Sequence, residues 1–302
     1  MSAIATPQDT RVAVGDVQFH VRIWSEAGPP IVLLHGLASS AHTWNLVARL
    51  LAPDFQVVAL DERGHGESDK PDTGYDLATF VEDVAGVIRA LRLDQPAVVG
   101  HSWGGNVALQ YAVTYPEAIS HLVLVDGGFS DMQLRDGLTW EVAEKNMTPP
   151  DLRMPFPAFV ERIRNRLGSA YSDAVRDAIL GNLWVDERGV IHPHLTRERH
   201  MQLARAIWEH RTSQLFEKVQ CPTLVVPAEP PDLIADPERL RWKRRGVAAA
   251  EQRLPRARIL WMHETPHDIQ LYRADDLASA IAQFVGPGRR RDVAASPSVA
   301  GD

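Results

Sequence analysis

Residues 97–104 have the sequence Ala97-Val98-Val99-Gly100-His101-Ser102-Trp103-Gly104, in which an apolar run leads into the pattern Gly-x-Ser-x-Gly. Apolar residues then recur with helical spacing, for example at Val107 and Tyr111. A serine at a sharp strand-to-helix turn has a strained backbone, and its neighbours must be small enough for adjacent chain to pass. Such a turn exposes the hydroxyl at a helix N-terminus, where anions are stabilised. The pattern therefore predicts that Ser102 is a nucleophile.

Short apolar runs of the same kind alternate with helix-periodic segments along most of the chain, from Val12 to Phe284. Continuous apolar runs predict parallel strands that are buried on both faces, and they occupy residues 31–34, 57–60, 97–99, 122–125, 223–226 and 259–262. Residues 17–24 alternate like an edge strand, and residues 80–91 have the spacing of an amphipathic helix. This order predicts an α/β protein with a doubly wound, mostly parallel sheet.

The alternation breaks between residues 127 and 219, a proline-containing stretch with amphipathic segments. At 302 residues the chain suits one large α/β domain with an inserted lobe. We therefore expect a core from residues 1–126 and 220–287, a helical cap from residues 127–219, and a disordered tail at residues 288–302. Large apolar side chains of the cap are candidates to line a substrate pocket: Trp140, Met147, Met154, Phe156, Phe159, Trp184 and Trp208.

The charge balance argues against a nucleic-acid partner. The chain has 32 basic and 39 acidic residues and a net charge of −7, so no broad basic face is available to neutralise phosphates. One basic run, residues 241–245, lies in a helix-like stretch near Glu238 and Glu251. We expect it to form a solvated helix face.

Cysteine content and the chain start predict a cytoplasmic protein. Cys221 is the only cysteine, which rules out an intrachain disulfide. The first ten residues lack the basic and apolar regions of a signal peptide. No apolar run approaches the roughly 20 residues that span a bilayer, so we expect no membrane partner. The sequence carries no signal for an oligomeric state.

Three further segments accompany the serine motif in a fixed order. His35-Gly36-Leu37 follows the run at 31–34, residues 61–68 follow the run at 57–60, and His267-Asp268-Ile269 follows the last run. Together these motifs resemble those of the α/β-hydrolase fold family, over about residues 12–284. The resemblance implies an α/β-hydrolase fold with a helical cap inserted after the sixth strand. It also implies that His267 is the general base of Ser102.

The resemblance leaves the triad acid open between two aspartates. The family usually places it after the seventh strand as Gly-x-x-Asp, but here Ala228 replaces the glycine, Pro231 takes the aspartate position, and Asp232 is one residue late. Some branches, including certain haloalkane dehalogenases, carry the acid at the end of the sixth strand, which is Asp126 here. We favour Asp126, with Asp232 as its competitor and Glu229 third.

By family position, the oxyanion hole uses the backbone N–H groups of Leu37 and Trp103, which are fixed before charge develops. Their side chains are then free to shape the pocket. The histidines at 192, 194 and 200 match no common zinc spacing. We therefore predict no metal and no organic cofactor.

The serine motif also resembles the Gly-His-Asp-Trp-Gly elbow of epoxide hydrolases and haloalkane dehalogenases, with Ser102 in place of the aspartate. An aspartate nucleophile forms an alkyl ester, whereas a serine activated by histidine forms an acyl-enzyme. The resemblance thus implies a carboxylesterase or lactonase for a small to medium apolar substrate. Two alternatives stay open: a carbon–carbon bond hydrolase of ring-cleavage products, and a ligand receptor of this fold with little turnover.

Overall fold

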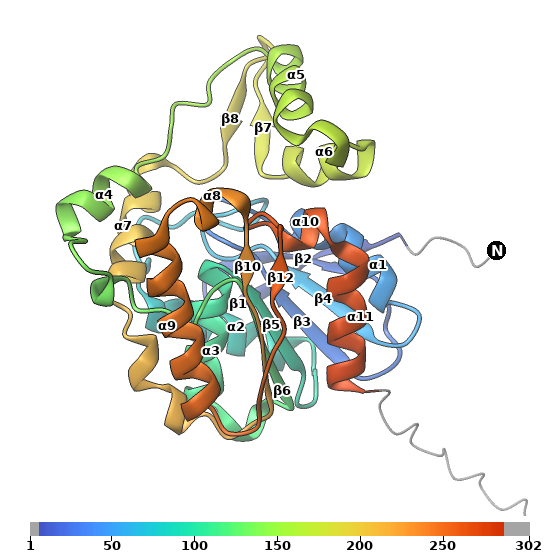
Figure 1. Ribbon diagram of the computed structural model, residues 1–302. Coiled ribbons are helices and arrows are strands. Elements are labelled where there is room, and N and C mark those ends of the chain that lie inside the picture. The colour runs from blue at the N-terminus through green and yellow to red at the C-terminus, as the bar shows by residue number, and fades with distance from the viewer. Residues whose placement is uncertain (1–5, 287–302) are drawn as a thin grey trace, which may run out of the picture.

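The computed structural model describes residues 6–286, so the predicted tail at 288–302 lies outside the described residues. Its centre is an eight-stranded sheet with the order β1-β2-β4-β3-β5-β6-β9-β11 (Figure 1). The pairs β1/β2 and β2/β4 are antiparallel, and all other neighbours are parallel. The strands are β1 (Gln8–Val14), β2 (Val17–Ile23), β3 (Pro30–Leu34), β4 (Gln56–Leu60), β5 (Ala97–His101), β6 (His121–Val125), β9 (Thr223–Val226) and β11 (Ala257–Ile259).

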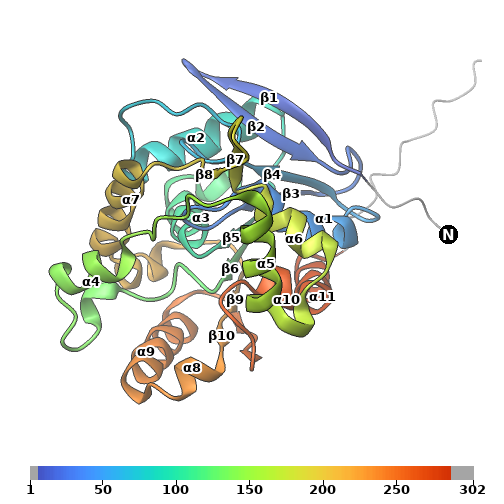
Figure 2. The same cartoon turned by 90° about the horizontal axis from the view of Figure 1, so that it is seen from above.

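Helices cover both faces of this sheet (Figure 2). Successive residues of β3 show why: Val32 and Leu34 join the apolar cluster under α2, α3 and α9, whereas Ile31 and Leu33 join the cluster under α1 and α11. These helices are α1 (Asn45–Leu51), α2 (Leu77–Ala90), α3 (Trp103–Thr114), α9 (Pro237–Arg253) and α11 (Ala274–Val285). The predicted mostly parallel, doubly wound α/β architecture is confirmed.

Two strand predictions are wrong in detail. Residues 17–24 do not form the edge, because β1 pairs along the whole of β2. Only Val12 of β1 is buried, so the strand lacks an apolar run that would have revealed it. Residues 259–262 are not one strand: β11 ends at Ile259, and β12 (Met262–His263) pairs separately with β10 (Ala228–Glu229).

The chain between β6 and β9 leaves the sheet and folds above the carboxyl ends of its strands (Figure 1). It contains α4 (Trp140–Met147), α5 (Phe156–Leu167), α6 (Asp173–Leu180) and α7 (Arg197–Glu209). It also contains a hairpin of β7 (Leu183–Val185) and β8 (Ile191–Pro193), which the sequence does not predict. Phe159, Ile163 and Leu167 of α5 pack in a separate small apolar cluster with Val175 and Ile191.

Shorter elements complete the described chain. Two short helices, α8 (Pro231–Ile234) and α10 (Ile269–Tyr272), follow the strand ends near the site described below. The 3₁₀ turns are η1 (Ala41–Trp44), η2 (Pro116–Ala118), η3 (Met132–Leu134), η4 (Gly168–Ala170), η5 (Thr212–Gln214) and η6 (Phe216–Lys218). Within residues 6–286, no helix combines the length and apolar character that a membrane span requires.

Candidate active site

Ser102 lies on a tight turn between β5 and α3, with a backbone φ of 54° and ψ of −115°. A Cβ atom at Gly104 would lie 2.5 Å from the Leu34 carbonyl oxygen, and one at Gly100 would lie 2.0 Å from the Gly104 carbonyl oxygen. Only glycine fits at these two positions, which explains the Gly-x-Ser-x-Gly pattern. The Ser102 amide donates to the Val125 carbonyl at 3.0 Å. The serine is therefore held beside the carboxyl end of β6.

Asp126 and His267 meet next to this turn. Asp126 directly follows β6 with a positive φ of 45°, and its Oδ2 accepts a hydrogen bond of 2.6 Å from His267 Nδ1. Asp126 Oδ1 accepts a second bond of 2.8 Å from the Ala228 amide. The Asp126 side chain is only 5% exposed, whereas that of His267 is 51% exposed. A buried carboxylate thus orients an accessible imidazole.

The two other candidate acids lie elsewhere. Asp232 is 73% exposed, and its Oδ2 lies 3.4 Å from Arg239 Nη1. α8 begins at Pro231, directly after Pro230, and places Asp232 in its first turn, where the side chain pairs with Arg239 of α9. Glu229 Oε2 accepts a hydrogen bond of 2.6 Å from His263. Of the three carboxylates, only Asp126 contacts His267.

Lys243 of α9 contacts Asp126, and the sequence does not predict this contact. Its Nζ lies 2.6 Å from Asp126 Oδ1 and donates to the Ala228 carbonyl at 2.5 Å. The predicted solvated face is therefore wrong at this position, because the Lys243 side chain is buried. Lys243, Val247 and Ala250 have the i, i+4, i+7 spacing of one helix face. This spacing relative to two apolar residues is the sequence signal that Lys243 lies on the buried face of the helix.

His101 links the serine turn to the histidine loop. Its Nε2 donates to the His267 carbonyl at 3.0 Å, and the two imidazole rings have centroids 4.7 Å apart. Because His101 directly precedes Ser102, this contact holds His267 beside the turn. The Ser102 hydroxyl makes no hydrogen bond to His267 in the structure described. Catalytic hydrogen bonds of free enzymes are often long and tighten with substrate.

The charges of this cluster shift the pKa values of its members. Burial alone would raise the pKa of Asp126, but the hydrogen bond and charge of His267 and the charge of Lys243 outweigh burial and lower it. The protein packed around the half-exposed His267 would lower its pKa, but the hydrogen bond and charge of Asp126 outweigh this desolvation and raise the pKa above 6.5. Burial, together with the charge of His267, lowers the pKa of His101 to about 4. The structure thus favours an ionised Asp126 and a neutral His101 at neutral pH.

Leu37 and Trp103 lie on the two backbone segments that flank Ser102. A Cβ atom at Gly36 would lie 3.1 Å from Ser102 Cβ, so the loop with Leu37 packs closely against the serine. Within residues 6–286, neither the Leu37 nor the Trp103 amide donates to a protein acceptor. The Leu37 side chain lines a cavity, as expected. The Trp103 side chain does not: it is buried in the core, edge-to-face with Phe80.

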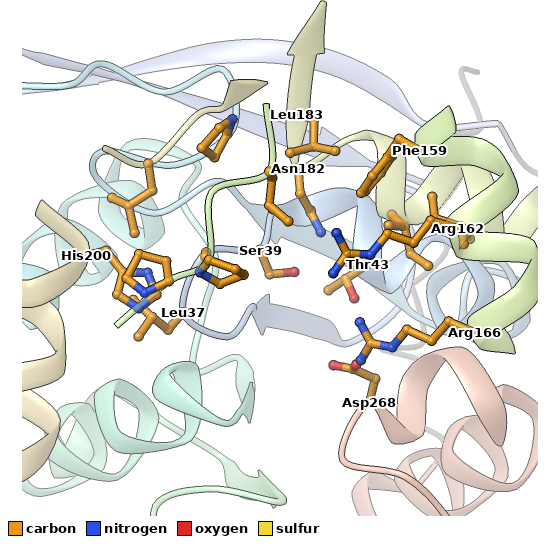
Figure 3. A pocket seen from close by; sticks show the side chains of 18 of the residues that line it. Leu37, Ser39, Thr43, Phe159, Arg162, Arg166, Asn182, Leu183, His200 and Asp268 are labelled. Atoms are coloured by element: carbon orange, nitrogen blue, oxygen red, sulfur yellow. The ribbon is translucent and has the colours of Figure 1, made fainter. Parts of the chain in front are cut away.

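A cavity of about 640 Å³ lies between the segment that connects β6 to β9 and loops at the carboxyl ends of the sheet strands (Figure 3). Leu37 and Asp268, which directly follow Gly36 and His267, belong to its wall, although Ser102 and His267 themselves do not. Of the seven large apolar cap residues considered above, Phe159 lines the cavity. Trp140 and Trp208 instead pack against each other, with ring centroids 6.0 Å apart.

The cap histidines have ordinary protein partners. His192 Nε2 lies 3.0 Å from Asp186 Oδ2, and the imidazole stacks on Trp184. His200 Nε2 donates to the Met147 carbonyl at 2.9 Å. Across residues 6–286, no group of three or more His, Cys, Asp or Glu side chains is arranged to hold a metal ion.

A family model and several curated relatives match part of the chain. A family model described as "alpha/beta hydrolase fold" matches residues 29–170. A 2-(acetamidomethylene)succinate hydrolase of Mesorhizobium japonicum is 35% identical over 116 residues, which are 38% of this chain and 41% of the relative. A soluble epoxide hydrolase of Corynebacterium is 41% identical over 100 residues, 33% of this chain and 35% of the relative. The matched region spans less than half the length of these curated relatives.

Solved structures resemble nearly the whole chain. The crystal structure of an E-2-(acetamidomethylene)succinate hydrolase has a TM-score of 0.75 at 24% identity, and the match covers 93% of this chain and 99% of that one. An enol-lactonase of Burkholderia xenovorans has a TM-score of 0.69 at 19% identity, over 91% and 99% of the two chains. At such identities the likeness shows the fold alone. The sheet order, the serine turn, the family match over residues 29–170 and the structural neighbours agree that the chain has the alpha/beta hydrolase fold.

Proposed function

We propose that this chain is a serine hydrolase that cleaves a carboxylic ester or lactone of a small to medium, largely apolar substrate. The observation that carries the proposal is the 2.6 Å hydrogen bond between Asp126 and His267 beside the strained Ser102. In this proposal Ser102 is the nucleophile, His267 the general base and Asp126 the carboxylate that orients it. Residues 127–219 act as the cap over the site.

The proposed reaction has two halves. Ser102 Oγ attacks the substrate carbonyl while His267 Nε2 takes its proton, and the protonated histidine then gives that proton to the leaving alcohol. The resulting acyl-enzyme is hydrolysed when His267 takes a proton from water and the water attacks the ester carbonyl. Asp126 stabilises the imidazolium in both halves without taking a proton. None of these steps needs a metal ion or an organic cofactor.

The amides of Leu37 and Trp103 are the proposed oxyanion hole. Among the described residues neither amide has a protein acceptor, and both belong to segments packed against Ser102. Two N–H groups from a fixed backbone can stabilise a negative oxygen without reorganising during the reaction. The N-terminus of α3, which begins at Trp103, adds its positive dipole end at the same place.

The names of similar proteins support hydrolysis at carbonyl carbon. The neighbours include an enol-lactonase and an esterase from Exiguobacterium antarcticum, both at identities below 25%. The epoxide hydrolase among the relatives agrees less well with our proposal. A serine that attacks an acyl group forms an ester, which water can hydrolyse, whereas a serine that attacks an epoxide would form an ether.

Covalent trapping tests the nucleophile directly. A fluorophosphonate should label Ser102, and mass spectrometry of the digest locates the label. Ser102→Ala should lower kcat for p-nitrophenyl acetate by roughly 10⁴- to 10⁶-fold, since the nucleophile is lost. Ser120→Ala, far from the site at the start of β6, is the matched control and should leave kcat near that of the parent protein.

Other results would contradict the proposal. A label on a residue other than Ser102, or full esterase activity in Ser102→Ala, would show that another group attacks. Turnover confined to carbon–carbon bonds of ring-cleavage products would favour that alternative reaction. Tight ligand binding with no turnover across a broad ester and lactone panel would favour a receptor.

A further inference from the structure

The cavity under the cap carries more positive than negative charge. Its charged wall residues are Arg153, Arg162, Arg166, Arg197, Asp151 and Asp268. Arg153 and Asp151 neutralise each other through a 2.6 Å ion pair. Three arginines then face one carboxylate, Asp268, although the chain as a whole has a net charge of −7. The positive cavity is therefore a local feature and does not follow from overall composition.

Two of these arginines lie on one face of α5. Phe159, Ile163 and Leu167 anchor the helix in the small apolar cluster of the cap. Arg162 and Arg166, four residues apart, extend from the helix into the cavity, toward Thr43 and Asp268 of the core (Figure 3). Like charges at this spacing repel each other. An anion bound between the two guanidinium groups would relieve that repulsion.

Asp268 is the one wall carboxylate left to balance three arginines, and Arg166 extends toward it without forming an ion pair within the described residues (Figure 3). In the described part of the chain, neither Arg162 nor Arg166 has a hydrogen bond or an ion pair. Asp268 has an oxygen 4.0 Å from His101 Nε2 and directly follows His267 in the sequence. The cavity wall thus reaches from the unpaired arginines to the residue next to the proposed base.

We propose that Arg162 and Arg166 bind a free carboxylate of the substrate while its ester or lactone carbonyl lies at Ser102. This inference rests on the proposed function and narrows its largely apolar substrate to one with a single charged end: a half-ester of a short dicarboxylic acid, or a lactone of a hydroxydicarboxylic acid. Planar guanidinium groups match carboxylate oxygens in paired hydrogen bonds. Leu37, Ile163 and Leu271 supply apolar wall for the carbon chain between the two ends. A volume of about 640 Å³ suits a small molecule of this size.

Matched esters test the charge requirement. We expect the protein to hydrolyse monoethyl glutarate with a higher kcat/KM than the neutral diethyl glutarate. Hydrolysis of either ester is measured from the proton that it releases. In the double variant Arg162→Gln/Arg166→Gln, kcat/KM for monoethyl glutarate should fall about 10- to 100-fold, the usual effect of losing a charge-assisted hydrogen bond. The value for diethyl glutarate should change less than about twofold, because its second ester group carries no negative charge to pair with the arginines.

Arg164→Gln is the matched control, because Arg164 lies on the same helix but has its guanidinium carbon 4.9 Å from the Tyr171 ring centroid and outside the cavity wall. It should leave both rates unchanged. Equal loss on both esters in the double variant, or no preference for monoethyl glutarate in the parent protein, would overturn the inference while leaving Ser102-dependent hydrolysis intact.

Binding without turnover separates the two proposals. Calorimetry with glutarate should show binding to the parent protein and to Ser102→Ala, weakened about 10-fold or more in the double variant. If no ester is hydrolysed and Ser102 is not labelled, the proposed function fails and this titration still decides the inference. Absent binding, equal binding in the double variant, or binding of inorganic phosphate in preference to glutarate would each overturn the carboxylate assignment.

Discussion

Asp126 receives three donors at once, from His267, the Ala228 amide and Lys243. A carboxylate that is 5% exposed would be costly to ionise alone, and these charge-assisted bonds offset that cost. The backbone contributes too, because the Asp126 amide donates to the Val226 carbonyl at 2.9 Å. The residue is thereby fixed between β6 and β9, where a side chain can reach the histidine loop.

Asp126→Asn should lower kcat by about 10⁴-fold, because the orienting charge is lost and the imidazole no longer keeps the required tautomer. The acid limb of kcat/KM should also move to lower pH. Asp126 raises the pKa of His267 above 6.5, and the base must be neutral, so in the parent protein activity is lost as the pH falls through that raised pKa. Steady-state kinetics from pH 5 to 9 would measure both effects.

Asp232→Asn is the control, since the carboxylate of Asp232 is exposed and lies beside Arg239 instead of His267. It should change kcat less than about twofold. A large loss in Asp232→Asn, with Asp126→Asn near the parent value, would move the acid to the other aspartate.

The position of helix α9 as a whole places Lys243 beside Asp126. Val247 and Ala250 pack in the core. Lys243 lies on the same helix face, and its Nζ donates to the Ala228 carbonyl. Arg244, the next residue, turns outward and pairs with Glu229 at 2.8 Å. The docking of α9 therefore sets the local charge around Asp126, and in the proposed mechanism Lys243 is a positioning residue that acts through Asp126.

Lys243→Met should move the acid limb of kcat/KM to higher pH. The lysine charge lowers the pKa of His267, so its removal lets Asp126 stabilise the imidazolium more strongly. A pH profile separates this effect from simple loss of packing, which would lower activity without moving the limb. Arg245→Met, on an exposed part of α9, is the control. An unmoved acid limb in Lys243→Met would show that the lysine has only a structural role.

For the whole molecule, the sequence predicted most of the sheet because buried parallel strands are continuous apolar runs, such as residues 31–34 and 122–125. It also predicted the serine turn, because sterics admit only glycine at positions 100 and 104. It did not predict β1, which has one buried residue. It missed the Lys243–Asp126 pair as well, because side chains 117 residues apart in sequence meet only through the packing of α9. Contacts of this kind depend on tertiary geometry, which local patterns do not contain.

Glu62 couples the stability of the whole molecule to pH. Its side chain is 1% exposed, and neither carboxyl oxygen has a hydrogen-bond partner. Burial, together with the charges of Asp83 and Asp61, raises the pKa of Glu62 well above 4.5. The folded protein therefore keeps this carboxyl protonated over a pH range in which the unfolded chain ionises it. Stability from this group is complete below the unfolded pKa and is lost as the pH rises toward the folded pKa.

Glu62→Gln should remove this loss, because glutamine does not titrate. The free energy of unfolding of the variant, relative to the parent, should therefore become more favourable as the pH rises from 4 to 7, by at most about 1.4 kcal/mol per pH unit. A constant offset, from burying an amide with few partners, does not affect this slope. Urea denaturation followed by tryptophan fluorescence at several pH values measures it, with Glu251→Gln on exposed α9 as the control for the substitution. A difference between Glu62→Gln and the parent that stays constant with pH would show that Glu62 is ionised in the folded protein and has a partner that offsets its burial.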